Sequence, residues 1–242
     1  MMIPLIKYNV EYYIKSVKYL PPLIFFIAFL AIKFQASPIG IWSNLHITSI
    51  AIFILSTWIG VSFVNSEDKT QQYITRLHTK NETVYHFSKI VSIVLFLIPF
   101  YVITLLVPVV FGSFARDLLL SEIFVYFAVY FLIGLTGASI GIFFNSDILS
   151  GETAILLHLL VTTVVVVPFD TIFADNLFVV YAHYLLPPTN FLAERLHNLN
   201  DGMNDGVFTI DRNFLLFAAW SLGYAVILTA LYNFIIQRRN KK

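Results

Sequence analysis

The sequence contains no cysteine and few charged residues. Among its 242 residues none is a cysteine, and 12% carry a charged side chain. The missing cysteines exclude disulfides, thiolate metal sites and cysteine nucleophiles. Soluble domains have about 25% charged residues, so these few charges do not suffice for the surface of a soluble fold. The net charge of +1 provides no basic excess for neutralising phosphates, which argues against nucleic acid as a partner.

Hydrophobic residues make up 58% of the chain, and the mean hydropathy is +0.80. A spanning helix needs about 20 mostly apolar residues, and the apolar runs here lack the alternation of barrel strands. We therefore predict an all-α integral membrane protein, with a single transmembrane domain of six transmembrane helices over residues 1–242. The predicted spans are Leu20–Phe34, Leu45–Val64, Ile90–Phe111, Leu118–Phe144, Thr153–Phe169 and Phe214–Ile236.

The basic residues indicate an orientation, because Lys and Arg concentrate in cytoplasmic loops. Six spans place both termini on one side of the membrane. The basic residues on that side are Lys7, Lys15, Lys18, Lys69, Arg76, Lys80, Lys89, Arg238, Arg239, Lys241 and Lys242, against Lys33, Arg116, Arg195 and Arg212 on the other. We therefore predict a multi-pass protein of the plasma membrane, with both termini and the loop 65–89 in the cytoplasm.

Two segments outside the spans have patterns of their own. Residues 1–19 carry apolar side chains at helical spacing and lysines on another face, which predicts an amphipathic helix lying on the membrane. This helix is either a simple anchor or a brace that carries motion into the first span. In the outer segment 174–212, ten apolar residues too short to cross precede Pro187 and Pro188. We predict a re-entrant or extracellular hairpin there.

One motif suggests an enzyme. G-A-S-I-G, Gly137–Gly141, resembles the serine motif of rhomboid intramembrane proteases. A nucleophilic serine needs a base within hydrogen-bond reach, but the last predicted span has no histidine, and His158 lies in the preceding one. We therefore predict no catalytic residue and no metal site. An intramembrane protease, an ion-driven carrier and a membrane scaffold remain the alternatives.

The same region has a second interpretation in helix packing. Small residues at i and i+4 on an apolar helix allow two backbones to approach closely. Gly134, Gly137 and Gly141 lie near one helix face. We predict that these glycines pack against a neighbouring helix.

The charged residues that the spans lack are concentrated in the loop 65–89. Its charged residues are Glu67, Asp68, Lys69, Arg76, Lys80, Glu82 and Lys89. Within it, residues 69–80 are predicted to form a short helix with Tyr73, Ile74 and Leu77 on one side. Such a segment is either a solvated loop or a docking element for a soluble partner.

Six spans, an amphipathic N-terminal helix, a polar first cytoplasmic loop and the absence of a nucleotide-binding motif resemble the ABC-2-type export permeases. In that family an acid follows the second span, then a short helix, a basic residue and a lysine opening the third span. Glu67, Gln71–Leu77, Lys80 and Lys89 follow this order, and His183–Phe191 resembles the family's proline-bearing stretch before the last span. Permeases that export small amphipathic peptides, such as phenol-soluble modulins, are similar in length.

The resemblance implies the permease subunit of an ATP-driven exporter, which moves an amphipathic or hydrophobic cargo, a peptide or a lipid-like molecule, out of the cytoplasm. Its partners would be cytoplasmic ABC ATPase subunits, which bind ATP and Mg, a second permease, identical or related, and membrane lipid. The chain itself would bind no cofactor. The implied ATPase-coupling residues are Glu67, Asp68, Gln71, Tyr73, Arg76, Leu77 and Lys80, and the implied outer gate is Pro187 and Pro188.

Overall fold

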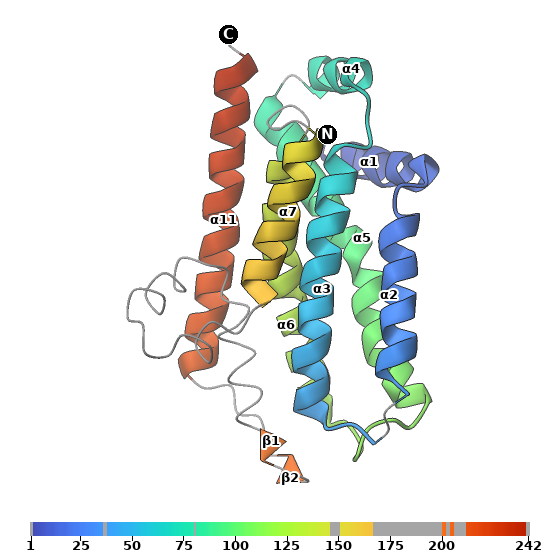
Figure 1. The fold of residues 1–242 in the computed structure, drawn as a ribbon. Helices are drawn as coiled ribbons and strands as arrows, with labels where there is room; N and C mark the ends of the chain where they lie inside the picture. The colour runs from blue at the N-terminus through green and yellow to red at the C-terminus, as the bar shows by residue number, and fades with distance from the viewer. Residues whose placement is uncertain are drawn as a thin grey trace.

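The structure is a computed structural model. It describes residues 2–35, 38–79, 81–145, 151–166, 200–201, 204–205 and 212–240. These residues are helical almost throughout (Figure 1). The exceptions with regular structure are two short antiparallel strands, β1 (Asn200–Asp201) and β2 (Asn204–Asp205). The predicted all-α class is confirmed.

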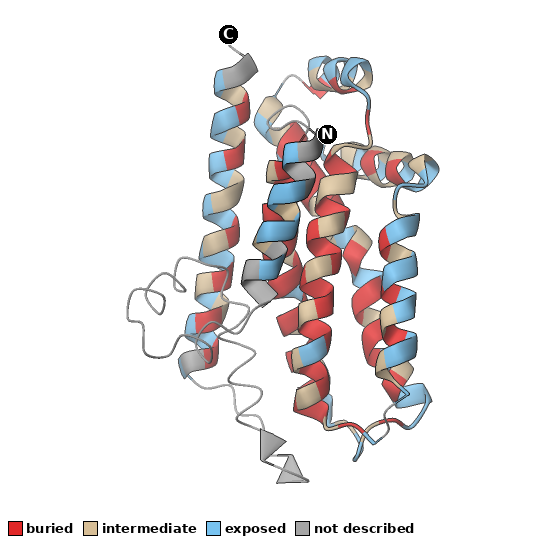
Figure 2. Ribbon diagram, in the orientation of Figure 1, coloured by how far each residue is buried: buried red, intermediate tan, exposed pale blue. Residues whose placement is uncertain are grey.

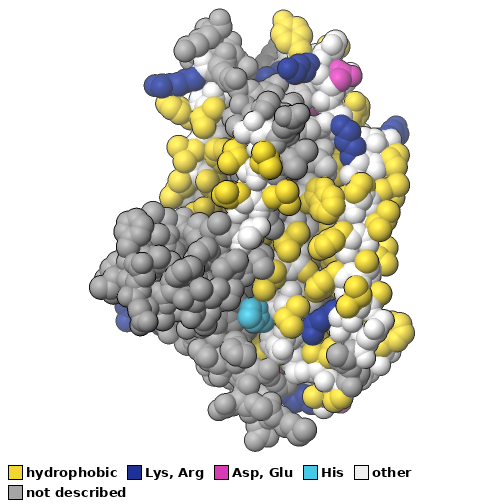
Figure 3. Space-filling view, viewed as in Figure 1, with side chains coloured by type: hydrophobic (Ala, Val, Ile, Leu, Met, Phe, Trp, Pro, Cys, Tyr) yellow, Lys and Arg dark blue, Asp and Glu magenta, His cyan; other side chains and the backbone are white. Residues whose placement is uncertain are grey.

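Among the described residues, four helices are long and apolar enough to cross a membrane. They are α3 (Ile41–Val64), α5 (Glu82–Val110), α6 (Leu120–Gly141) with its 3-10 continuation η1 (Ile142–Phe144), and α11 (Arg212–Asn240). Figure 1 shows them running along the length of the same bundle. On the face shown in Figure 3, hydrophobic side chains cover the part of the flank that is coloured by type, and the visible Lys and Arg side chains lie towards the two ends of the bundle. The chain is therefore a membrane-embedded protein.

The other two predicted spans are shorter helices in the described residues. α2 (Leu20–Lys33) has 14 residues and α7 (Gly151–Val166) has 16, fewer than the about 20 that cross a bilayer. The N-terminal helix α1 (Met2–Ser16) meets α2 at a bend of 78°. If this bent pair is one broken span, the described residues contain five spans, compared with the six predicted.

The bend between α1 and α2 follows from local sequence. Val17 has a φ of 61°, a left-handed conformation that stops a helix of L-residues. Pro21 and Pro22 then occupy the first turn of α2, where a missing backbone N–H removes no intrahelical hydrogen bond. As a result α1 runs across one end of the bundle, and α2 descends along its side (Figure 1).

The core of the bundle lies between α3 and α6. The apolar segments of both are 67% buried, against 44% for α5 and 22% for α11, and Figure 2 shows buried residues along the full length of α3. Polar side chains also join the two helices, because the Thr48 and Tyr130 hydroxyls lie 2.7 Å apart and Tyr126 donates to the Ile41 carbonyl. α11 is the outermost of the four long helices.

The start of α5, next to the candidate site, differs from the prediction. α5 begins at Glu82, whereas hydropathy predicts a span from Ile90. Asn81 caps the helix, since its side chain accepts hydrogen bonds from the backbone N–H groups of Thr83 and Val84, as expected of an N-cap asparagine. Residues 82–89 of the predicted loop are therefore the first two turns of α5.

Candidate functional site

The segment between α3 and α5 contains a separate short helix, α4 (Lys69–Thr79). Asp68 precedes it and accepts a hydrogen bond of 2.7 Å from the Gln71 backbone N–H, which stabilises the helix start. In Figure 1, α4 lies across the end of the bundle that also carries α1 and the last turns of α11. The charged segment is therefore a helix held outside the bundle rather than an extended connection.

The outer face of α4 is apolar. Tyr73 is 65% exposed and Leu77 is 59% exposed, and Ile74 beside them is also exposed. Gln72 and Thr79, on the opposite face, are buried. An exposed apolar cluster on an otherwise polar helix is typical of an interaction surface. We call Tyr73 and Leu77, with Ile74 at the edge that turns towards α1, the outer face of α4.

A buried ion pair joins the start of α4 to α5. The Lys89 Nζ lies 2.8 Å from the Glu67 Oε2, and the two side chains are only 4% and 3% exposed. The Tyr85 hydroxyl donates to the same carboxylate oxygen at 2.7 Å, and the Lys89 Nζ lies 4.8 Å from the centre of the Tyr85 ring. Glu67, predicted as a coupling residue of the loop, thus does not lie on the outer face of α4.

The partners of Glu67 determine its protonation. Burial by itself raises the pKa of this carboxyl group, but the charge of Lys89 and the hydrogen bonds from Lys89, Tyr85 and Tyr8 outweigh burial and lower it below the ordinary value. The carboxylate is therefore ionised at neutral pH, as the ion pair with Lys89 requires.

Acidification is expected to remove the stability that Glu67 contributes. Because the folded-state pKa lies below the ordinary 4.5, the unfolded chain binds the proton first as the pH falls. The contribution is therefore present above about pH 4.5 and is lost as the pH falls through the lower folded-state pKa. Thermal unfolding of the protein in detergent measures this between about pH 7 and pH 3. The Glu67→Gln variant should lose this part of the pH dependence, and an unchanged profile would contradict the assignment.

Further contacts hold the inner face of α4. The Gln72 side chain donates to the Glu67 backbone carbonyl at 3.0 Å and accepts from Arg76 at 3.3 Å. The Arg76 guanidinium lies 5.4 Å from the centre of the Tyr85 ring, within range of a cation–π interaction. Arg76 therefore contacts α5, although the sequence predicts it as a coupling residue.

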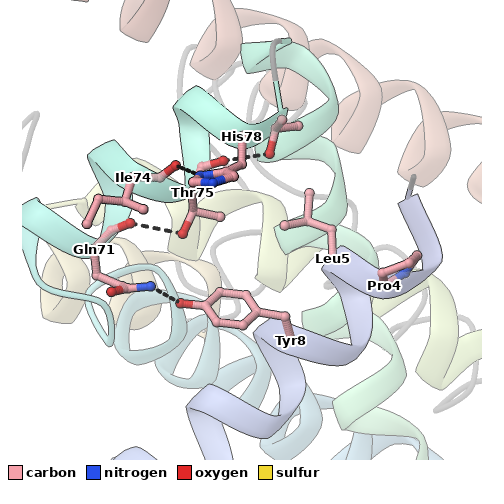
Figure 4. Close-up of a pocket in the computed structure, with 8 residues that line it drawn as sticks. Pro4, Leu5, Tyr8, Gln71, Ile74, Thr75 and His78 are labelled. Carbon is pink, nitrogen blue, oxygen red and sulfur yellow. Dashed lines mark hydrogen bonds between the residues drawn. The ribbon is translucent and has the colours of Figure 1, made fainter.

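A small pocket separates α4 from α1 (Figure 4). Gln71 bridges the two helices, because its side-chain amide donates to the Tyr8 hydroxyl at 2.9 Å. The pocket has a volume of about 350 Å³, and Leu5, Ile74 and His78 are among the residues that line it. α4 is thus bonded to α1 on one side and to α5 on the other.

Sequence reasoning missed the aromatic and polar residues beneath α4. His86 is buried with its ring edge-on to those of Tyr85 and Tyr232, at centroid distances of 5.1 and 5.2 Å. The Asn145 side chain donates to the Tyr232 hydroxyl at 2.9 Å, so Tyr232 of α11 contacts both α5, through His86, and the end of η1. The available signal was the run Y-H-F-S-K at Tyr85–Lys89, whose polar residues precede the apolar run directly.

The structure brings the predicted glycines to helix contacts. A Cβ on Gly137 would lie 3.0 Å from the Phe53 carbonyl oxygen, and a Cβ on Gly141 would lie 2.5 Å from the Thr57 carbonyl oxygen. Both oxygens belong to α3. A Cβ on Gly134 would instead overlap the Tyr101 hydroxyl of α5. The other predicted site residues, Lys80, Pro187 and Pro188, lie outside the described residues.

The described residues do not assemble a serine–histidine pair. The Ser139 hydroxyl donates to the Leu135 carbonyl at 2.8 Å, within its own helix. The His158 ring packs edge-on to Phe144 with a centroid distance of 5.5 Å, and within the described part of the chain no histidine is hydrogen-bonded to Ser139. In the same residues, no group of three or more acidic or histidine side chains is arranged to hold a metal ion.

Comparison with protein-family models, with curated proteins and with solved structures finds no match for this chain.

Proposed function

We propose that this chain is the membrane-spanning permease subunit of an ATP-driven exporter, on which a separate cytoplasmic ATPase acts through α4. The observation that supports this proposal is the two-sided character of α4. Its outer face is apolar and exposed, whereas Gln71 is hydrogen-bonded to Tyr8 of α1 and Arg76 lies over the Tyr85 ring of α5. A helix of this kind can transmit the motion of a bound partner to the spans.

The exposed face of α4 suits a protein partner. Tyrosine is enriched among residues that dominate binding energy at protein interfaces, and Tyr73 and Leu77 lie one turn apart on the outer face of α4. Covering them removes apolar surface from water, which stabilises a complex. The contact would be formed by a cleft on the ATPase, on the cytoplasmic side of the membrane.

The contacts of α4 provide two routes into the membrane. The Glu67–Lys89 ion pair connects the start of α4 to the span α5. The Gln71–Tyr8 hydrogen bond connects it to α1, which continues through the bend into α2. A partner shifts a conformational equilibrium only if it binds the two states unequally. ATP-bound partners would therefore favour the permease state in which α4 fits the closed ATPase pair.

The cargo that fits this proposal is amphipathic or hydrophobic, a peptide or a lipid-like molecule. The buried residues with charged side chains, Glu67, Lys89 and Glu122, lie before a helix or within its first eight residues, so none of them is in the middle of the described spans. A second permease, identical or related, would complete the transport path. ATP and Mg would bind to the ATPase subunits.

Replacing Tyr73 and Leu77 together with alanine is expected to abolish partner binding without unfolding the spans. Both side chains are exposed, so their loss costs the fold little, whereas a central tyrosine and its apolar neighbour together are expected to contribute about 3 kcal/mol or more to binding. At about 1.4 kcal/mol per factor of ten, the affinity should fall roughly 100-fold or more. The measurement is vanadate-sensitive ATPase activity that co-purifies with the tagged chain from native membranes.

Ile24→Ala, on the exposed side of α2, is the matched control and should retain the co-purified activity. The proposal fails if the double variant retains that activity, or if the purified chain hydrolyses ATP by itself. A membrane scaffold would leave the wild-type preparation without ATPase activity.

A further inference from the structure

A groove lies in the angle between α1, α2 and α5. Its volume is about 690 Å³, within the roughly 300–1,000 Å³ of small-ligand sites. The walls are apolar and include Leu23 from α2 and Phe96, Phe100 and Ile103 from α5. Lys7 and Glu11, from α1, lie at the same groove and supply its charge. The charged side chains of the groove therefore all come from α1, beside the apolar Val10 and Ile14 of the same helix, and α5 contributes an apolar wall.

The dimensions of the groove match one leaflet of a bilayer. The Asn9 side chain of α1 donates to the Ser88 hydroxyl of α5 at 3.1 Å, and the Ile6 carbonyl lies 3.5 Å from the Ser92 hydroxyl, so α1 crosses α5 at this level. From Ser92 to Ile103 α5 rises about 16 Å, at about 1.5 Å per residue. Half of a hydrocarbon core about 30 Å thick is about 15 Å. A lipid tail that entered the groove beside α1 would reach the middle of the membrane near Ile103.

The two charged side chains at α1 form an incomplete pair. The Lys7 Nζ lies 3.8 Å from the Glu11 Oε1, and the side chains are 77% and 54% exposed. Exposed pairs at this distance contribute little to stability. One cation and one anion therefore remain available, at the mouth of an apolar groove, for a ligand that carries both charges.

We propose that this groove binds one zwitterionic phospholipid of the phosphatidylethanolamine class. The lipid phosphate lies beside Lys7, its ammonium group donates hydrogen bonds to Glu11, and one acyl chain follows Phe96 and Phe100 towards Ile103. Because α1 crosses the bundle end and α5 spans the membrane, the groove is continuous with a single leaflet. The bound lipid fills the angle of the α1–α2 bend.

The headgroup determines selectivity at such a site. The acyl chains of the different phospholipids are equally apolar. Contacts between an acyl chain and the groove therefore do not favour one headgroup class over another. Charge-assisted hydrogen bonds are stronger than neutral ones, and the ethanolamine ammonium has N–H groups for the Glu11 carboxylate. A choline headgroup has no N–H to donate, and a glycerol headgroup has no positive charge. The expected order is therefore phosphatidylethanolamine before phosphatidylcholine and phosphatidylglycerol.

Native mass spectrometry of the whole chain tests this proposal without any partner ATPase, so it is independent of the proposed function. The protein is reconstituted into nanodiscs with equal parts of phosphatidylethanolamine, phosphatidylcholine and phosphatidylglycerol, and the lipids retained on release are identified. The wild type should retain one phosphatidylethanolamine at least fivefold above the other two. Glu11→Lys should shift the preference to phosphatidylglycerol, and the swap Lys7→Glu with Glu11→Lys should restore phosphatidylethanolamine.

The apolar part of the groove has its own matched pair of variants. Ile103 and Ile98 are both on α5 and both 41% exposed, but only Ile103 lines the groove. Ile103→Trp should abolish the retained lipid, and Ile98→Trp should leave it unchanged. Because the chain has no cysteine, Ile103→Cys also reports on contact with a second copy through disulfide cross-linking. Retained lipids in the proportions of the nanodisc, or efficient cross-linking at Ile103, would overturn the proposal.

Discussion

Replacing Lys89 with methionine is expected to lower the free energy of unfolding by about 3–5 kcal/mol, because one charge of a buried pair then remains without its partner. Glu67 and Lys89 are 2.8 Å apart and almost completely buried. In the variant the Glu67 carboxylate retains the Tyr85 hydroxyl but loses the positive charge beside it. For a chain of about this length the melting temperature shifts by roughly 2–4 °C per kcal/mol. Thermal unfolding in detergent therefore measures a large decrease.

A double variant separates the unpaired charge from general damage to the core. Glu67→Gln combined with Lys89→Met leaves no buried charge, and removing both members of a buried pair is often close to neutral. The double variant should therefore melt nearer to the wild type than Lys89→Met does. Equal destabilisation of the single and double variants would show that the pair contributes through shape rather than charge.

This ion pair also indicates what the sequence could not reveal. Glu67 and Lys89 are both visible as charges in a chain that has few. The segment is correctly distinguished from the spans only before Glu82, because Lys89 lies within α5. The mutual burial of Glu67 and Lys89 depends on α4 turning aside between them, so that Tyr85 and Lys89 on α5 face back towards Glu67. Hydropathy assigns a charged residue to water, whereas a charge with a partner can be buried.

The helix boundaries show a similar limit. The apolar run alone places the start of α5 at Ile90, because Glu82–Lys89 is too polar for lipid. The Asn81 side chain, which accepts from Thr83 and Val84, determines that the helix begins eight residues earlier. A capping residue followed by an acid was the local signal for this start. Membrane depth and helix length are thus separate quantities, and hydropathy predicts only the first.

The number of spans was the least predictable feature. α3, α5, α6 and α11 correspond to four predicted apolar runs that are long without interruption. The run of α2 is short, and its helix is separated from α1 by the turn at Val17. A broken span and an interfacial helix followed by a short span have the same composition. Only the bend of 78° distinguishes a continuous helix from these alternatives.

The glycines of α6 predict a close approach to a neighbouring helix, and the structure gives the distances of this approach. α3 and α6 make the most extensive contact among the described helices. At Gly141 the nearest atoms to an added Cβ are backbone atoms of α3, with the Gly60 Cα at 2.9 Å and the Thr57 carbonyl oxygen at 2.5 Å. Backbone cannot move aside as a side chain does, so a methyl group there must separate the two helices.

Replacing Gly141 with alanine is therefore expected to destabilise the protein by about 1–3 kcal/mol, as overpacking of a close-packed core does. Gly223→Ala on α11 is the matched control, because no atom lies within 4 Å of the added Cβ. An alanine within a helix gains about 0.5–1 kcal/mol over glycine, so the two substitutions should change the melting temperature in opposite directions. If Gly141→Ala instead melts at or above the wild-type temperature, α3 and α6 are not held together by direct backbone contact.

A Gly60→Ala variant tests the same contact from α3. Its added methyl group would lie 3.1 Å from the Gly141 Cα, so this variant should be destabilised as well.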